Sequence, residues 1–397
     1  MPAPAHHDHH LPTLIFHELM AVALFATSAY HSSQSKATQA SFGLTFIAAI
    51  VYQTVLHLPS WNGLTCWSAP SLLSTSQYLP RAHEILFMTV ALYISFITVQ
   101  TMSRTYPRCR TALVQGLMTA VTFLLVVLPS HLLSAAFLWR TWHSNLPTVM
   151  GVPINEIERL LLFTTCLQLS SLLPRRTTAM HQHVKRALLS VLACCLLQFN
   201  GYIVPRLRIV VLTMVYGVLP LVLLFINNNK YVPHSKQKSS SPRPLRPGMK
   251  KSSMFAGALL FYFVGLIVVS LAGDPATHRS FGYHQKWGGS CGDNGEVCRK
   301  QEGQAVWKLC NESFTTYDID DVNHVKKTVG WYALCGRSRA TNSRGLGVAL
   351  VVAVVSAGWF VGVFLLVRVP VHEDDDGRKG ETPNKPTRTH NSNNQSN

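Results

Sequence analysis

The chain has little negative charge. Its 397 residues include 18 Asp and Glu against 35 Lys and Arg, and charged residues make up 13% of the total, whereas soluble domains carry roughly a quarter. Between Glu18 and Asp274 the only carboxylates are Glu84, Glu156 and Glu158. This scarcity excludes an ordinary soluble protein. It also restricts acid, base or metal chemistry in the apolar part of the chain to few side chains, because a charge at bilayer depth is costly.

Long apolar runs occupy the stretch that lacks carboxylates, and apolar residues make up 48% of the chain. A run of about 20 such residues is long enough to cross a bilayer as a helix. We therefore predict an all-α polytopic membrane protein with about nine transmembrane helices. The predicted spans are 11–30, 42–58, 84–102, 112–132, 159–174, 187–204, 208–226, 254–272 and 346–368.

Lysine and arginine cluster in alternate loops, which follow the third, fifth and seventh predicted spans. By the positive-inside rule these loops are cytoplasmic, so the amino terminus is predicted to be outside or luminal and the carboxyl tail cytoplasmic. The net charge of +17 is then explained by topology, and no nucleic-acid partner is expected. The clustered residues are Arg104, Arg108 and Arg110; Arg175, Arg176, Lys185 and Arg186; and Lys230, Lys236, Lys238, Arg243, Arg246, Lys250 and Lys251.

Composition divides the chain into five parts. Residues 1–41 form a luminal amino terminus and first span; that span is either retained or a cleaved signal, and the lack of a basic leading region favours retention. Residues 42–227 form a six-span bundle. Residues 228–253, rich in Ser, Pro and Lys, are predicted to be a basic cytoplasmic linker. Residues 254–368 form a two-span module around a luminal loop, 273–345, and residues 369–397 a disordered cytoplasmic tail.

The luminal loop 273–345 contains four of the nine cysteines. An even number of cysteines in an oxidising compartment predicts two disulfides, with three pairings open. A zinc site is the alternative, but the cysteine spacings lack the short pairs that are usual for zinc. Asn311 begins a glycosylation sequon in the same loop, and Cys109 lies where palmitoylation could occur. The loop cysteines are Cys291, Cys298, Cys310 and Cys335.

Polar residues gather at the predicted outer ends of the spans. Each could simply face headgroups and water, and an acidic residue in a first helical turn also complements the helix dipole. Ionisable groups at membrane depth otherwise indicate function by default. Together they predict a luminal polar cap on an apolar bundle, with Glu18 and His17 of the first span near the same face. The residues of this cap are His57, His83, Glu84, His131, Glu156 and Glu158.

No enzymatic motif accompanies the polar cap, so whether the protein is an enzyme stays open. Haem ligation would need facing histidines on neighbouring helices; His57 and His131 could pair at the outer edge, but no second pair lies at the inner edge within a span. Ester hydrolysis would need a nucleophile beside a base, and outer hydroxyls such as Ser130 show no such partner in the sequence. Intramembrane amides such as Gln53 could line a transport pathway, although amides also bridge helices. We expect no metal and no other cofactor.

Residues 42–228 resemble the Frag/DRAM/Sfk family of six-span membrane proteins, which includes a Golgi factor for remodelling GPI-anchor lipids. The resemblance rests on topology, on a Pro/Ser-rich first luminal loop and on an acidic entry to the fourth span of the family pattern. The first span and the carboxy-terminal module lie outside that pattern. The residues that carry the resemblance are Pro70–Ser76, Pro80, His83, Glu84, Pro153–Glu156 and Pro205.

The resemblance implies lipid handling in membranes of the secretory or endolysosomal system, including GPI-anchor remodelling, with membrane lipids as partners. Under this hypothesis the polar cap would contact lipid headgroups. A second hypothesis is a receptor or adhesion protein that binds a protein partner through the loop 273–345. A third is a transporter. The expected location is an integral position in the endoplasmic reticulum, Golgi, lysosome or plasma membrane.

Overall fold

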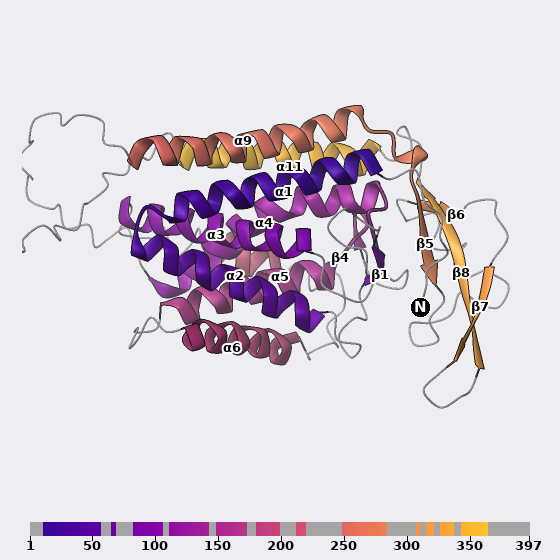
Figure 1. Cartoon of the computed structure of the whole chain (residues 1–397), viewed down its shortest axis with the longest axis horizontal. Helices are drawn as coiled ribbons and strands as arrows, with labels where there is room; N and C mark the ends of the chain where they lie inside the picture. Colours follow the sequence, from indigo (N-terminus) through magenta and orange to yellow (C-terminus); the bar gives the residue numbers. More distant parts are fainter. Residues whose placement is uncertain are drawn as a thin grey trace, which may run out of the picture.

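A computed structural model gives the fold of the chain. It describes residues 11–56, 65–68, 82–105, 111–142, 148–172, 180–198, 212–219, 248–283, 307–309, 315–320, 326–336 and 343–363. Most of these residues are helical, as the sequence predicts. Figure 1 shows the helices side by side along the long axis of the molecule, with a β-sheet at one end, which we call the sheet end. The helices are α1 (Leu11–Ser32), α2 (Lys36–Leu56), α3 (Ala82–Thr105), α4 (Ala112–Ala136), α5 (Ile154–Ser171), α6 (Met180–Gln198), α9 (Gly248–Ala272) and α11 (Ser343–Val361), with a π-helical segment, η2, at Thr213–Val218.

Five of the described helices, α1, α3, α4, α9 and α11, are long and apolar enough to cross a membrane. Their outward faces are apolar as well: large side chains such as Phe261 and Val268 of α9 and Val351 and Val355 of α11 are exposed. A helix that is apolar on its inner and its outer face suits a lipid surround. The chain is therefore a helical integral membrane protein. The count of nine spans stays a prediction, since α2, α5, α6 and η2 do not meet the same criteria of length and composition.

Helices α2, α5, α6 and α9 each begin five to seven residues earlier than the predicted spans. The difference at α5 concerns a carboxylate. The predicted span begins at 159, after the last carboxylate, whereas the helix begins at Ile154 and includes Glu156 in its first turn. The helix can begin earlier because its positive amino-terminal end favours a carboxylate there. Similarly, α3 includes Glu84 in its first turn. Glu84 and Glu156 thus belong to the first turns of their helices.

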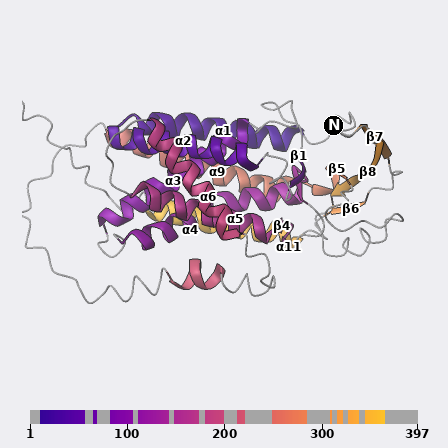
Figure 2. The ribbon, with the colours of Figure 1, turned by 90° about the horizontal axis from the view of Figure 1, so that it is seen from below.

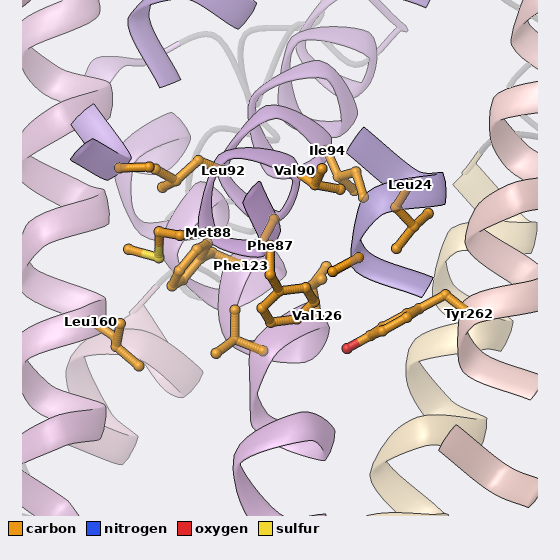
Figure 3. Close-up of a cluster of buried hydrophobic side chains, with 14 of the residues drawn as sticks. Leu24, Phe87, Met88, Val90, Leu92, Ile94, Phe123, Val126, Leu160 and Tyr262 are labelled. Atoms are coloured by element: carbon orange, nitrogen blue, oxygen red, sulfur yellow. The ribbon is translucent and has the colours of Figure 1, made fainter. Parts of the chain in front are cut away.

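The core of the bundle lies around α3. Some 72% of the apolar window of α3 is buried, against 33% for α11, so α3 is central and α11 peripheral. Figure 3 shows Phe87, Val90 and Ile94 of this helix packed against Phe123 and Val126 of α4 and Tyr262 of α9. Fully buried small residues, among them Ala91 and Ala120, let the backbones approach closely, as membrane helices require when lipid supplies no hydrophobic driving force.

A proline in α4 is compensated by the last helix. Pro129 lies inside α4, and because proline has no N–H, the carbonyl of Leu125 loses its usual helical donor. The hydroxyl of Ser356 in α11 donates to this carbonyl at 2.7 Å. In a bilayer core an unpaired carbonyl is costly, so this bond both satisfies α4 and fixes α11 beside it.

The two helices that the sequence groups into a carboxy-terminal module pack on the other helices. Figure 1 shows α9 and α11 along one side of the bundle, with α1 next to them. Just after α9, the backbone at Gly273 comes close to the Phe137 ring: a Cβ placed on Gly273 would lie 2.5 Å from Phe137 Cζ and 2.8 Å from the carbonyl oxygen of Val269. Only glycine fits this contact between the ends of α9 and α4.

The sheet beyond α9 has four antiparallel strands, β5 (Arg279–Tyr283), β6 (Trp307–Leu309), β7 (Thr315–Asp320) and β8 (Lys326–Gly336). The long strand β8 pairs with each of the other three, and Cys335 of β8 lies opposite Arg279 and Lys308 in the register. Figure 2 shows that this sheet stays at one end of the bundle in a second view. Two smaller sheets accompany it, formed by β1 (Thr65–Ser68) with β2 (Arg140–Trp142) and by β3 (Thr148–Val149) with β4 (Val152–Pro153).

Several predicted features lie outside the described residues. They are His57, Cys109, Cys291, Cys298, Cys310, Asn311, the linker before residue 248 and the tail after residue 363.

Candidate functional site

A small polar cavity lies at the sheet end of the bundle, between α1, α2, α3, α4 and α5. We call it the sheet-end cavity. Its volume is about 60 Å³, enough for a few waters or one small polar group, and far below the several hundred cubic ångströms of a drug-sized pocket. Leu14, Phe87, Met88, Val127 and Leu160 form its apolar lining, and its aromatic and polar lining consists of His17, Tyr52, Gln53, His83, Glu84, Ser130, His131, Ser134, Trp139, Arg140 and Glu156.

The cavity brings together four residues of the predicted polar cap: His83, Glu84, His131 and Glu156. They come from the first turns of α3 and α5 and from the last part of α4, so the antiparallel course of the helices places them at one end. His83 and Glu156 are each only 5% exposed. His83 and Glu156 therefore face the interior of the bundle, whereas Glu84 and His131 are half-buried. Glu158 is not among the lining residues.

Arg140 is the cation of the sheet-end cavity, and it forms an ion pair with Glu84. Both side chains are less than a fifth exposed. Burial by itself lowers the pKa of Arg140, but the nearby carboxylates of Glu84 and Glu156 outweigh it and raise that pKa above its ordinary value. Arg140 therefore stays charged, and the two carboxylates balance a cation that would otherwise be costly to bury.

A left-handed residue directs Arg140 into the cavity. After α4 ends, Leu138 adopts φ of 56° and is nonetheless buried. This conformation costs a non-glycine residue of the order of 1 kcal/mol. It turns the chain back, so that Trp139 and Arg140 line the cavity instead of continuing away from it. Backbone strain of this kind is retained where the surrounding structure requires it.

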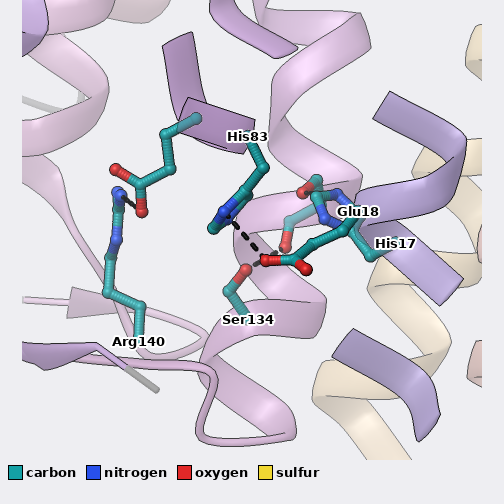
Figure 4. Close-up of polar contacts among 7 residues, drawn as sticks. His17, Glu18, His83, Ser134 and Arg140 are labelled. Carbon is teal, nitrogen blue, oxygen red and sulfur yellow. Dashed lines mark hydrogen bonds and ion pairs between the residues drawn. The ribbon is translucent and has the colours of Figure 1, made fainter. Parts of the chain in front are cut away.

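A second buried pair joins α1 to α3. His83 Nδ1 lies 3.0 Å from a carboxylate oxygen of Glu18, and both side chains are almost fully buried. Figure 4 shows these two side chains pointing toward each other, with Arg140 on the other side of His83. The first helix thus contributes directly to the charged centre of the bundle, which makes α1 part of the folded site.

His17, the residue before Glu18, contacts α4. Its Nε2 lies 2.8 Å from the hydroxyl oxygen of Ser130. The ring lies among aromatic side chains, with centroid distances of 5.5 Å to Phe87, 5.4 Å to Trp139 and 6.5 Å to Tyr262. Within the described part of the chain, His17 Nδ1 is buried and has no hydrogen-bond partner.

A chain of hydrogen bonds connects the sheet to the bundle beside the cavity. The indole Nε1 of Trp139 donates to the Thr13 hydroxyl at 3.3 Å, and this hydroxyl lies 3.1 Å from His278 Nε2. On its other side, His278 Nδ1 lies 3.2 Å from the carbonyl oxygen of Asp274. All these donors are satisfied if His278 is neutral with its proton on Nδ1, because Thr13 can then donate to Nε2.

This arrangement predicts a loss of stability at acid pH. Burial lowers the pKa of His278 below its ordinary value of 6.5, although hydrogen bonding to the Asp274 backbone and the Asp274 charge oppose the shift. Below pH 6.5 the unfolded chain therefore binds a proton that the folded chain does not, so the free energy of unfolding falls as the pH drops; above pH 6.5 this loss is absent. We expect the melting temperature to fall between pH 7.5 and 5.5, with a contribution from His278 of at most about 1.4 kcal/mol.

The measurement is thermal unfolding of the full chain in detergent at the two pH values. His278→Gln keeps a polar side chain but cannot titrate, so its melting temperature should fall less than that of the wild type. An equal fall in both proteins would contradict the assignment of a neutral, buried His278.

The chemical capacity of the cavity follows from these side chains. Histidines and carboxylates at close quarters can accept and return protons, Arg140 can attract negative charge, and Ser130 is a hydroxyl nucleophile beside a potential base. Among the described residues, no group of three or more His, Cys, Asp or Glu side chains has the arrangement of a metal site. The cavity is thus equipped for acid–base chemistry on a small polar group.

Sequence reasoning missed Arg140, Ser130 as a partner of His17, Trp139 and Tyr52. Arg140 had a detectable signal: it is an isolated cation in a loop near the few carboxylates, and charges at membrane depth are usually paired. The contact between Ser130 and His17 joins residues 113 positions apart and has no local signal.

Comparison of the chain with protein-family models, with curated proteins and with solved structures gives no match.

Proposed function

We propose that this protein handles lipids within membranes of the secretory or endolysosomal system, and that the sheet-end cavity binds one polar group of a lipid. The observation that carries the proposal is the cavity itself: a small chamber with three histidines, two carboxylates and an arginine in its lining, at the end of a bundle whose outer surface is apolar. Such a chamber suits a molecule that is mostly hydrocarbon and has one small polar centre.

The volume of the cavity limits which part of a lipid can enter it. A volume of about 60 Å³ accommodates a hydroxyl, an amine or an ester, but not a complete phospholipid headgroup. The lipid would therefore keep its tails against the exposed apolar faces of the helices, where side chains such as Phe261 and Val355 provide surface, and insert only a single group.

The resemblance of residues 42–228 to the Frag/DRAM/Sfk family supports the same proposal. His83, Glu84 and Glu156, which carry part of that resemblance, all line the sheet-end cavity. Family members take part in membrane lipid homeostasis and in the remodelling of GPI anchors, so GPI-anchor lipids are one substrate class to examine.

The proposal also states on which side of the membrane the sheet end lies. With nine spans, the sheet end would lie outside or in the lumen. Arg104, at the end of α3, and Arg186, near the start of α6, are the basic-cluster residues that agree with this orientation. The loop cysteines, including Cys335 of β8, would then form two disulfides in an oxidising compartment, and Asn311 would be glycosylated. Mapping glycosylation at Asn311 against sequons inserted into other loops tests this orientation directly.

The functional test compares two glutamates of α5. Cells that lack the protein would be restored with the wild type, with Glu156→Gln or with Glu158→Gln. Glu156 lines the cavity and Glu158 does not, although both lie on the same helix and each substitution removes one charge. We expect Glu158→Gln to restore the lipid composition and the surface level of GPI-anchored proteins, and Glu156→Gln to fail.

Membrane lipids would be quantified by mass spectrometry and GPI-anchored proteins by flow cytometry, at matched abundance and melting temperature of the variants. If loss of the protein changes neither quantity, or if both variants restore them equally, lipid handling through this cavity is wrong. Deleting residues 280–340 in parallel tests the alternative of a receptor: loss of partner capture with an unchanged lipid composition would favour it.

A further inference from the structure

Ser130 bonds to a side chain of another helix, whereas several other buried hydroxyls bond to their own helix. Buried Ser and Thr side chains within helices commonly donate back to the carbonyl four residues earlier. Thr119, Thr164 and Ser270 do so here, and so does Ser134, one turn after Ser130. The hydroxyl of Ser130 instead meets His17 Nε2 at 2.8 Å. The sequence thus places a serine and a histidine, from two different helices, in direct contact at the cavity wall.

One tautomer of His17 would allow it to act as a base toward Ser130. If its ring proton is on Nδ1, then Nε2 accepts the hydrogen bond of the Ser130 hydroxyl, which is the arrangement of a nucleophile activated by a neighbouring base. His17 is 7% exposed, and its Nδ1 has no partner within the described part of the chain. A buried polar atom without a partner costs about 1–3 kcal/mol, and a catalytic role of the ring would account for this cost.

The depth at which Ser130 would lie in a bilayer indicates which group of a lipid it can reach. With 25 residues at 1.5 Å each, α4 is about 37 Å long, whereas the hydrocarbon core of a bilayer is about 30 Å thick. Ser130 precedes the last residue of α4, Ala136, by six positions, which corresponds to about 9 Å. A centred helix therefore places Ser130 about 5 Å inside the edge of the hydrocarbon core. The ester groups that join acyl chains to a lipid backbone lie near this boundary.

We propose that Ser130 and His17 form a nucleophile–base pair that cleaves a carboxylic ester of a membrane lipid. This inference rests on the proposed lipid function and names its chemistry. Ser130 Oγ bonds to the ester carbonyl carbon while its proton passes to His17 Nε2. The bond from that carbon to the lipid alkoxy oxygen then breaks, and the leaving oxygen takes the proton from Nε2. The acyl group remains on Ser130.

The second half of the reaction repeats the first with a new nucleophile. Water, or the hydroxyl of a second lipid, gives its proton to His17 Nε2 and bonds to the acyl carbon, and the bond to Ser130 Oγ breaks as this oxygen regains the proton. The products are a fatty acid or a new ester, so the pair supports either hydrolysis or acyl exchange. The oxyanion that forms in each step would lie in a cavity whose lining includes Arg140, which is paired with Glu84.

The test uses the full chain reconstituted in phosphatidylcholine vesicles and a long-chain alkyl fluorophosphonate, which phosphonylates activated serines. Mass spectrometry should find the label on Ser130 of the wild type, and none at this site in Ser130→Ala. His17→Phe keeps an aromatic ring among Phe87, Trp139 and Tyr262 but removes the base. The rate at which Ser130 is labelled should therefore fall at least about 100-fold in this variant, as expected when general base catalysis is lost. Ser95→Ala is the matched control and should label like the wild type, because Ser95 is a buried serine of α3 that donates to the carbonyl of Ala91 and lies outside the cavity lining.

Fatty acid release and acyl exchange are measured in the same vesicles, because a narrow cavity could exclude the probe. Release or exchange that depends on Ser130 and His17 supports the pair even without labelling. A wild type that is neither labelled at Ser130 nor more active than Ser130→Ala overturns it. If Glu156→Gln and Glu158→Gln restore the cells equally but Ser130 is labelled, the nucleophile–base pair is supported and the cellular lipid role is wrong. If only Glu156→Gln fails to restore the lipids but Ser130 is neither labelled nor active, the cellular lipid role is supported and the pair is wrong.

Discussion

Arg140→Met is expected to destabilise the protein by about 4 kcal/mol, within the range for removing one partner of a buried ion pair. The loss is large because the methionine leaves two carboxylates, Glu84 and Glu156, without the cation that balances both. Glu84→Leu should cost less, about 3 kcal/mol, because Glu156 still compensates Arg140. The double variant should recover part of the loss, since the Glu84–Arg140 pair is then replaced by apolar side chains.

The free energy of unfolding would be measured for all three variants in mixed detergent micelles, which yields the coupling energy of the pair. Arg344→Met is the matched control: Arg344 is exposed at the start of α11, and its replacement should change stability by less than about 0.5 kcal/mol. If Arg140→Met behaves like this control, the ion pair has the small value of a surface salt bridge, and the cavity is not a buried charged centre.

Gly273→Ala is expected to produce the other large effect, a destabilisation of about 1–3 kcal/mol as for overpacking in a close-packed interior. The added Cβ would lie within 2.6 Å of two atoms of the Phe137 ring and 2.8 Å from a backbone oxygen. Phe137 is fully buried, so its ring cannot swing away without disturbing the contact between the ends of α9 and α4.

Gly257→Ala in α9 provides the comparison. No atom lies within 4 Å of the Cβ that this substitution adds, and alanine in a helix interior is favoured over glycine by about 0.5–1 kcal/mol. The two variants should therefore shift the melting temperature in opposite directions. A Gly273→Ala protein as stable as the wild type would show that the ends of α9 and α4 are not packed as described.

The sequence predicts the helical membrane fold because apolar runs and basic clusters are local signals. It also identifies four of the cavity residues, since carboxylates and histidines are scarce in the spans. Glu158, the other residue of the predicted cap on α5, does not line the cavity, because residues two apart on a helix point about 200° away from each other around its axis. Arg140 and the contact of His17 with Ser130 depend on which helices are neighbours, and no local pattern encodes that.

The bond from Ser356 to the carbonyl of Leu125 has a consequence for biosynthesis. The two residues are 231 positions apart, so α4 is inserted long before its partner helix exists. Until α11 enters the bilayer, the carbonyl freed by Pro129 lacks this donor. Helix α4 is thus completed only by α11, and the carbonyl of Leu125 lacks this donor from the time α4 is made until α11 follows.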